Sequence, residues 1–316
     1  MNFSVRLVPA AVAAALLAAC SGGNGATSLP QAPQGGITPQ TATTTRTSAY
    51  SVVENGAAIS GTHIMPSLQN RTLRALAQVK SAGTNNLNYY GGPVQQNAKI
   101  YLVFWKFGSN DPYGEQSRIT SFVQGLNGSQ WTSTLTQYYD GAGHISNDIA
   151  YVNTWNDNTN SIPSRPTQSS VAAEAARAAA HFGDYSVNAM YFVALEKGHD
   201  PSGFATQWCA FHSTTSASGS TIAYTDFPYQ SDAGASCGEN SVNGGSGGIL
   251  DGVTIVGGHE IAEGVTDPQA GNGWLDSSGS EIGDKCAWTN LQNTSFSTGT
   301  FPTQPLWSNA AGGCVQ

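Results

Sequence analysis

The sequence predicts an α+β or α/β fold, built on a mixed β-sheet and a helix that carries ionisable side chains. In the first part of the folded region, short runs of β-branched and aromatic residues alternate with longer stretches of helical spacing. Two further strand-like runs then follow each other closely, as in a hairpin, and a long apolar helix comes after them. Alternating strands and helices with an added hairpin favour a mixed sheet packed against helices.

The individual elements follow from residue type and spacing. Residues 99–105 are almost all apolar, β-branched or aromatic, which indicates a buried strand. The alanine-rich stretch 169–182 is the clearest helix, with Ser170 near its start and Gly183 as its stop. The other predicted strands are 149–153, 190–195, 207–213 and 221–226, and the other predicted helices are 114–126, 129–139 and 250–265. Together they predict one compact domain over residues 87–316, about 230 residues, which can bury a sizeable core.

The N-terminus has the layout of a cleaved export signal. Arg6 precedes an apolar stretch over residues 7–19, which is too short to span a bilayer permanently. Cys20, after Leu-Ala-Ala, resembles the cysteine of a bacterial lipobox, which receives lipid through its thiolate. We therefore interpret residues 1–20 as a lipoprotein signal peptide; an ordinary secretory signal with an incidental cysteine is the alternative. Ser21 favours sorting to the outer membrane, so we expect an outer-membrane lipoprotein or a protein on the extracellular surface of a bacterium.

Two segments separate this signal from the compact domain. Residues 21–47 are rich in Gly, Ser, Thr, Pro and Gln and hold almost no large apolar side chain, so a disordered tether is expected. Residues 48–86 are modestly hydrophobic and include a helix-like stretch, 68–79. They are either a pro-segment or a strap across the domain, and the sequence leaves both alternatives open.

Charge and cysteine content exclude two kinds of site. The chain has 12 basic and 20 acidic residues, and only 10% of its residues are charged, which argues against a nucleic-acid partner held by phosphate contacts. With Cys20 assigned to lipid, four cysteines remain, and an oxidising compartment favours disulfides. We expect Cys209 to pair with Cys237 and Cys286 with Cys314, because each pair closes a loop of roughly 28 residues, worth about 3 kcal/mol. A cysteine-rich metal site would need C-x-x-C pairs, and the sequence contains none.

A short motif, His259-Glu260-Ile-Ala-Glu263, lies in the predicted helix 250–265. Residues four apart share one face of a helix, so His259 and Glu263 can direct a nitrogen and an oxygen at one ion. Glu260 then lies beside that ion, where a general base is needed, as in the H-E-x-x-H motif of zinc peptidases. A glutamate replaces the second histidine of that motif, so we expect one catalytic zinc ion, with manganese or iron as alternatives.

A solvated surface helix is the alternative interpretation of this motif. From residue 253 to residue 265, however, the helix has no other ionisable side chain, so three such groups are concentrated on an apolar element. Gly257 and Gly258 lower helix stability, which indicates close backbone packing or the close approach of a substrate. Both features favour a metal site.

A catalytic zinc needs a third protein ligand and an open position. Glu281 and Asp284 follow the helix. We expect Glu281 to be the third ligand, at about the offset used by gluzincin peptidases, and Asp284 to orient His259. Asp267 is a weaker third candidate.

Other residues carry secondary predictions. His212, on the predicted strand 207–213, is expected to donate a hydrogen bond to the oxyanion of a tetrahedral intermediate, with a packed histidine as the alternative. The remaining histidines, at positions 63, 144, 181 and 199, are expected in loops or on the surface. Residues 276–281 resemble a calcium loop but lack its usual second acidic or amide residue. The sequence contains no G-x-S-x-G elbow and no phosphate-binding loop.

Several segments share their order with a known family: residues 89–94, 100–105, 209–212, 251–267 and 307–314, with Gly203 before the third. In this order they resemble bacterial relatives of the plant EXORDIUM (phosphate-induced protein) family, over residues 87–316. The resemblance implies a zincin-like domain, with an active-site helix beneath the sheet and an edge strand beside the substrate cleft. The plant members are apoplastic proteins linked to growth that lack the His-Glu pair, so they imply an exported fold without catalysis.

The expected function is therefore metal-assisted hydrolysis of secreted or cell-surface polypeptide, by a zinc metallopeptidase with Glu260 as its base. A non-catalytic surface or cell-wall-binding lipoprotein is the alternative from a different class. Hydrolysis of a wall glycan or ester by the same metal centre is a third.

Overall fold

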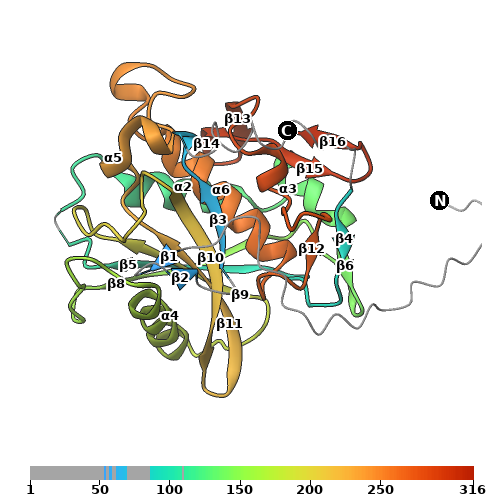
Figure 1. Ribbon diagram of the computed structural model, residues 1–316, viewed down its shortest axis with the longest axis horizontal. Coiled ribbons are helices and arrows are strands. Elements are labelled where there is room, and N and C mark those ends of the chain that lie inside the picture. The colour runs from blue at the N-terminus through green and yellow to red at the C-terminus, as the bar shows by residue number, and fades with distance from the viewer. Residues whose placement is uncertain (1–52, 55–56, 59–61, 70–85, 109) are drawn as a thin grey trace, which may run out of the picture. The chain divides into compact units, whose positions relative to one another are not determined.

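The computed structural model describes residues 53–54, 57–58, 62–69, 86–108 and 110–316. Its centre is a six-stranded sheet with the strand order β3-β10-β11-β9-β5-β8 (Figure 1). The strands are β3 (Thr62–Pro66), β5 (Lys99–Trp105), β8 (Ala150–Asp157), β9 (Ala189–Leu195), β10 (Trp208–Ala217) and β11 (Ser220–Phe227). β11, β9, β5 and β8 run parallel, whereas β10 is antiparallel to both of its neighbours. The predicted mixed sheet, including its hairpin, is confirmed.

Helices pack on both faces of this sheet (Figure 1). α4 (Gln168–Phe182) packs against β9, β10 and β11 on one face. α2 (Glu115–Gly125) and α6 (Asp251–Thr266) lie on the other, where α6 contacts β10, β11 and β3. β9 is buried along its whole length because both of its faces are covered, which explains its unbroken apolar sequence.

Local signals mark the ends of the clearest helix as the sequence predicted. Thr167 caps α4: its side chain accepts a hydrogen bond from the backbone N–H of Ser170, and the Ser170 side chain accepts one from Thr167 in return. Gly183 ends the helix in the left-handed conformation, with φ of 69°.

Shorter elements complete the domain. They are β1 (Val53–Glu54), β2 (Ala57–Ala58), β4 (Asn88–Tyr89), α3 (Gln130–Ser133), η1 (Thr134–Gln137), β6 (Tyr139–Asp140), β7 (Gly143–His144), α5 (Gln230–Ala233), η2 (Gly234–Cys237), η3 (Gly245–Gly247), β12 (Trp274–Leu275), η4 (Asp284–Cys286), β13 (Gln292–Phe296), β14 (Gly299–Thr303), β15 (Leu306–Ser308) and β16 (Gly313–Val315). The two expected disulfides, Cys209–Cys237 and Cys286–Cys314, are both present. The second one ties η4 to β16, close to the end of α6.

The segment expected to be a pro-segment or a strap supplies the sheet with its edge strand β3. Residues 1–52 and 70–85 lie outside the described residues, and so do the expected signal peptide, Cys20, the tether 21–47 and most of the helix-like stretch 68–79. In the part of the chain that is described, no helix is both long and apolar enough to cross a membrane.

Candidate metal centre

α6 is buried along its entire length, and two glycines allow its close packing. A Cβ at Gly257 would lie 2.7 Å from Cδ1 of Ile119, and a Cβ at Gly258 would lie 3.1 Å from Cζ of Phe122. The backbone of α6 therefore lies directly against α2, which is the close packing that these glycines indicated. His259, Glu260 and Glu263 come next on the helix and are 0% exposed.

His259 and Glu263 lie one turn apart on a shared face of α6. His259 Nε2 is 3.0 Å from Glu263 Oε1 and 3.9 Å from Asp284 Oδ1. The backbone N–H of Asp284 donates to Glu263 Oε1 at 3.0 Å, which holds η4 against the helix. One nitrogen and two carboxylate oxygens thus lie within 4.8 Å of one another, close enough to surround one cation.

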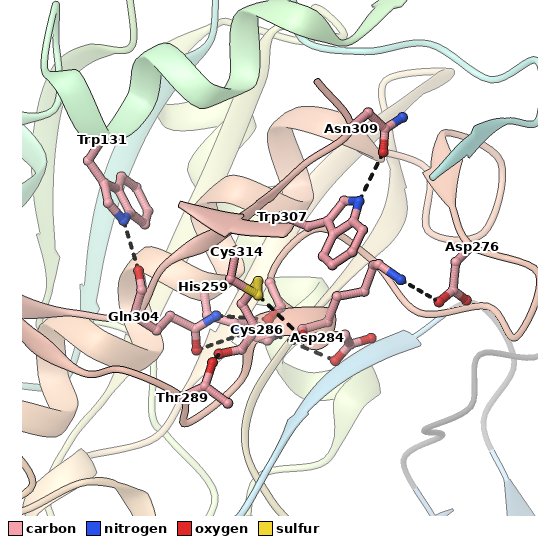
Figure 2. The surroundings of a disulfide bond; sticks show 12 residues. Trp131, His259, Asp276, Asp284, Cys286, Thr289, Gln304, Trp307, Asn309 and Cys314 are labelled. Atoms are coloured by element: carbon pink, nitrogen blue, oxygen red, sulfur yellow. Dashed lines mark hydrogen bonds and ion pairs between the residues drawn. A yellow bond between two sulfur atoms is a disulfide. The ribbon is translucent and has the colours of Figure 1, made fainter. Parts of the chain in front are cut away.

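Gln304 contacts the other nitrogen of His259. His259 Nδ1 lies 3.4 Å from Gln304 Oε1, and Gln304 Nε2 donates to the Gly283 carbonyl at 2.9 Å. Figure 2 shows Gln304 between Trp131, whose indole N–H donates to the Gln304 carbonyl at 2.9 Å, and His259. A contact at the second nitrogen fixes the orientation of a ligating imidazole. Gln304, which no sequence motif marked, lies at the nitrogen of His259 where an orienting group would act, while Asp284 lies nearer the other nitrogen.

β10 brings His212 to the opposite side of Glu263. His212 Nδ1 is 3.4 Å from Glu260 Oε2 and 3.6 Å from Glu263 Oε2. His212 Nε2 is 3.5 Å from Glu281 Oε1. Glu281, the preferred third ligand from the sequence, thus faces His212, while Asp284 lies beside His259. Asp284, rather than Glu281, is thus the carboxylate that lies in one group with His259 and Glu263.

The position of His63 contradicts one prediction. It was expected in a loop or on the surface, but it lies on β3 and is 1% exposed. Its Nδ1 is 2.7 Å from Glu281 Oε2, and its ring centroid is 5.5 Å from that of His212. The next residue but one on β3, Met65, donates its backbone N–H to Glu260 Oε1 at 3.2 Å. β3 therefore contacts the centre through a side chain and through its main chain.

The centre holds more carboxylates than imidazoles, and their burial perturbs their pKa values. Burial raises the pKa of Asp284 to about 7, and it raises that of Glu263 well above its ordinary value. Burial opposes protonation of His259, but the adjacent carboxylates outweigh it and raise the pKa of His259 to about 10. Burial likewise opposes ionisation of Glu281, but His63 and His212 hold its pKa below the ordinary value. The buried carboxylates of the centre therefore favour the uptake of positive charge, either as protons or as a bound cation.

Within the described ranges, several buried atoms of the centre form no hydrogen bond and have only the ion-pair contacts given above: His212 Nδ1 and Nε2, His259 Nε2, Glu260 Oε2, Glu263 Oε2, Asp284 Oδ1 and both carboxylate oxygens of Glu281. A buried polar atom without a partner costs about 1–3 kcal/mol, and native proteins keep few of them. Imidazole nitrogens and carboxylate oxygens are ligands of divalent cations, and a cation would satisfy several of these atoms at once. The residues present therefore fit a metal ion.

The carboxylates of the other acidic candidates, Asp267 and Asp276, form hydrogen bonds within nearby loops. Asp267 accepts hydrogen bonds from the backbone N–H groups of residues 271, 272 and 273, so it holds the loop after α6. Asp276, in the segment that resembles a calcium loop, accepts from residues 278 and 280 and pairs with Lys285 at 3.0 Å. Both carboxylates stabilise local loop structure. His144 and His181 are exposed, as predicted.

Comparison with known proteins gives one informative match. The chain is 28% identical to Protein EXORDIUM-like 5 of Arabidopsis thaliana over 269 residues, which covers 71% of each chain. This similarity supports distant homology to the EXORDIUM-like family. No protein-family model and no solved structure matches the chain. The name of the EXORDIUM-like relative states no activity.

Proposed function

We propose that this protein is a metal-dependent hydrolase that binds one divalent cation through His259, Glu263 and Asp284. One observation carries the proposal: three buried side chains from α6 and η4 converge within 4.8 Å, and two of their donor atoms lack a hydrogen-bond partner among the described residues. One imidazole and two carboxylates make a borderline to hard ligand set, which suits zinc and also manganese or iron. Zinc is the proposed ion.

Around that ion, the protein supplies groups that hold and move protons. When bound to His259, Glu263 and Asp284, the cation would supply Lewis acidity for a substrate carbonyl and for water. Glu260 is the proposed proton acceptor, because Oε2 has no hydrogen-bond partner among the described residues while Oε1 is held by the Met65 N–H. His212 lies beside Glu260 and is the proposed donor to the oxygen that gains negative charge. Polypeptide is the proposed substrate.

Metal content tests this proposal directly. Elemental analysis of the purified protein should find about one zinc per chain. The double variant His259→Ala/Asp284→Ala should lose it, whereas His144→Ala, an exposed histidine on β7, should keep it. Glu260→Gln should keep the metal and lower peptide hydrolysis by at least about 100-fold. Wild-type protein free of transition metal at neutral pH would refute the proposal, and full activity of Glu260→Gln would refute the role of Glu260.

A non-catalytic surface or wall-binding protein is the second candidate. It is favoured by the EXORDIUM-like similarity and by the complete burial of His259, Glu260 and Glu263. It predicts that metal, once bound, increases stability without any hydrolysis of protein, wall glycan or ester. Activity on wall polymers with none on protein would instead assign the same centre to a glycan or ester substrate.

A further inference from the structure

The edge of β10 is suited to bind an extended polypeptide, and β3 lies along it. We propose that β10 is a peptide-binding edge and that β3 is its built-in, displaceable occupant, which blocks the candidate metal centre until it leaves. The inference rests on the proposed function only for its effect on catalysis. Binding of a peptide to β10 is a separate property and can be measured without any turnover.

Pairing with β10 holds β3 in the sheet. β3 is the terminal strand of the six-stranded order, and it runs antiparallel to β10 with Ile64 opposite Phe211 and His63 opposite His212. The indole N–H of Trp288 donates to the Pro66 carbonyl at 2.7 Å, and the Gln207 carbonyl accepts from the Ser67 N–H at 3.2 Å. Most of these contacts use main-chain groups of β3. Any extended segment can offer those groups, while the buried side chains of β3, Ile64 and Met65 among them, would provide the specificity.

The position of β3 explains why the centre is closed. Met65 N–H donates to Glu260 Oε1, and His63 Nδ1 lies 2.7 Å from Glu281 Oε2. Glu260 and Glu281 are 0% exposed beneath this strand. A substrate strand that paired with β10 in the same way would pass its main chain over Glu260, the proposed proton acceptor. The strand that now occupies this position is therefore placed as a substrate would be.

The sequence context agrees with a separable occupant. β3 is the first strand of the sheet along the chain, and 32 residues separate its last residue, Pro66, from Lys99, the first residue of β5. Its hydrogen bonds to Gln207, Glu260 and Trp288 all reach residues more than a hundred positions away in sequence. A tethered segment competes at an effective concentration that reaches millimolar, so a free peptide would be largely excluded while the tether is intact.

Cutting the tether provides the test. A recognition sequence for a site-specific protease is inserted within residues 70–85 of the full chain, and the same sequence is inserted at Ser218-Gly219, in the β10–β11 turn, as the matched control. Each protein is cleaved, and a fluorescent synthetic peptide of residues 60–69 is titrated into it with anisotropy as the readout. We expect at least about 100-fold tighter apparent binding after cleavage at 70–85 than in the uncleaved or control-cleaved protein. Hydrolysis of peptides should rise in the same sample only.

The outcomes separate the two proposals. Peptide exchange without hydrolysis supports the binding edge and counts against the hydrolase. Failure of the labelled peptide to exchange over a day, or unfolding of the domain on cleavage at 70–85 as seen by circular dichroism, shows that β3 is a permanent strand and overturns the inference. Ile64→Asp in the intact chain is a second route, because it places a charge at a position that is 2% exposed. It should also increase peptide binding, whereas Val152→Asp, at an exposed position, should not.

Discussion

Gly283 allows the geometry of the centre to be tested with one added methyl group. In Gly283→Ala, the new Cβ would lie 2.7 Å from His259 Nδ1 and 2.9 Å from Glu263 Oε1. Ordinary contacts begin near 3.4 Å, so both side chains must shift by several tenths of an ångström. The backbone at Gly283, with φ of −77° and ψ of −45°, accepts alanine without strain, so the effect isolates this contact.

The expected magnitude follows from two opposing terms. Overpacking costs about 1–3 kcal/mol, while the loss of glycine entropy in the unfolded chain returns about 0.4–1 kcal/mol. We expect a net loss of about 1–2 kcal/mol in the free energy of unfolding. Displacement of His259 and Glu263 should also lower metal affinity by about 10–100-fold, the range seen when the surroundings of a ligand are disturbed.

Urea unfolding and competition with a chromogenic zinc chelator measure the two effects. The control is Gly247→Ala, at the end of the short 3₁₀ helix η3, where an added Cβ meets no atom within 4 Å. It should leave both measurements nearly unchanged. If Gly283→Ala behaves like Gly247→Ala in both assays, the packing of Gly283 against His259 and Glu263 is not as described here, and the ligand geometry built on it fails.

Three further predictions address the surroundings of the centre, the fold and the N-terminus. Gln304→Leu removes the acceptor at His259 Nδ1 and should weaken metal binding about 10-fold by chelator competition, with no loss if the ring is oriented by other groups. Asp184, although partly buried, pairs with Lys99 and accepts from Ser186, which lowers its pKa to about 2. Because its pKa is lowered in the folded state, ionised Asp184 stabilises the fold above about pH 4, and this contribution disappears as the pH falls towards 2. Asp184→Asn should therefore lower the free energy of unfolding in urea by about 1–2 kcal/mol at pH 7 and by much less near pH 2. An equal loss at both pH values would exclude this linkage. Cys20→Ser should abolish incorporation of labelled fatty acid in a bacterial host, and unchanged labelling would rule out lipidation at Cys20.

Much of the fold could be read from local sequence patterns. The run 99–105, which is apolar after Lys99, corresponds to β5 without a shift of either end, and the alanine-rich helix has the predicted stop at Gly183. These features follow from residue periodicity and capping, which depend on neighbours in the chain. The disulfide pairs were also predictable, because four cysteines with equal loop lengths leave few reasonable pairings.

The composition of the centre could be predicted only in part. His259, Glu260 and Glu263 lie on one helix, so their spacing alone placed them on shared faces. Which carboxylate lies near which histidine depends on the path of the loop after α6, and offset from the helix does not specify that path. Gln304 and His63 gave no signal, since a lone glutamine and a lone histidine carry no motif.

The order and type of most elements, the two disulfides and the helix that carries three ionisable side chains could all be predicted from local patterns along the chain. The residues that meet those side chains depend on how the chain packs: Asp284 lies beside His259, His212 lies between Glu263 and Glu281, and β3 pairs with β10. The physical reason is that helices, caps and strands arise from interactions between near neighbours, whereas the centre joins segments separated by up to 218 positions. Its contacts exist only once the sheet, α6 and η4 have packed together.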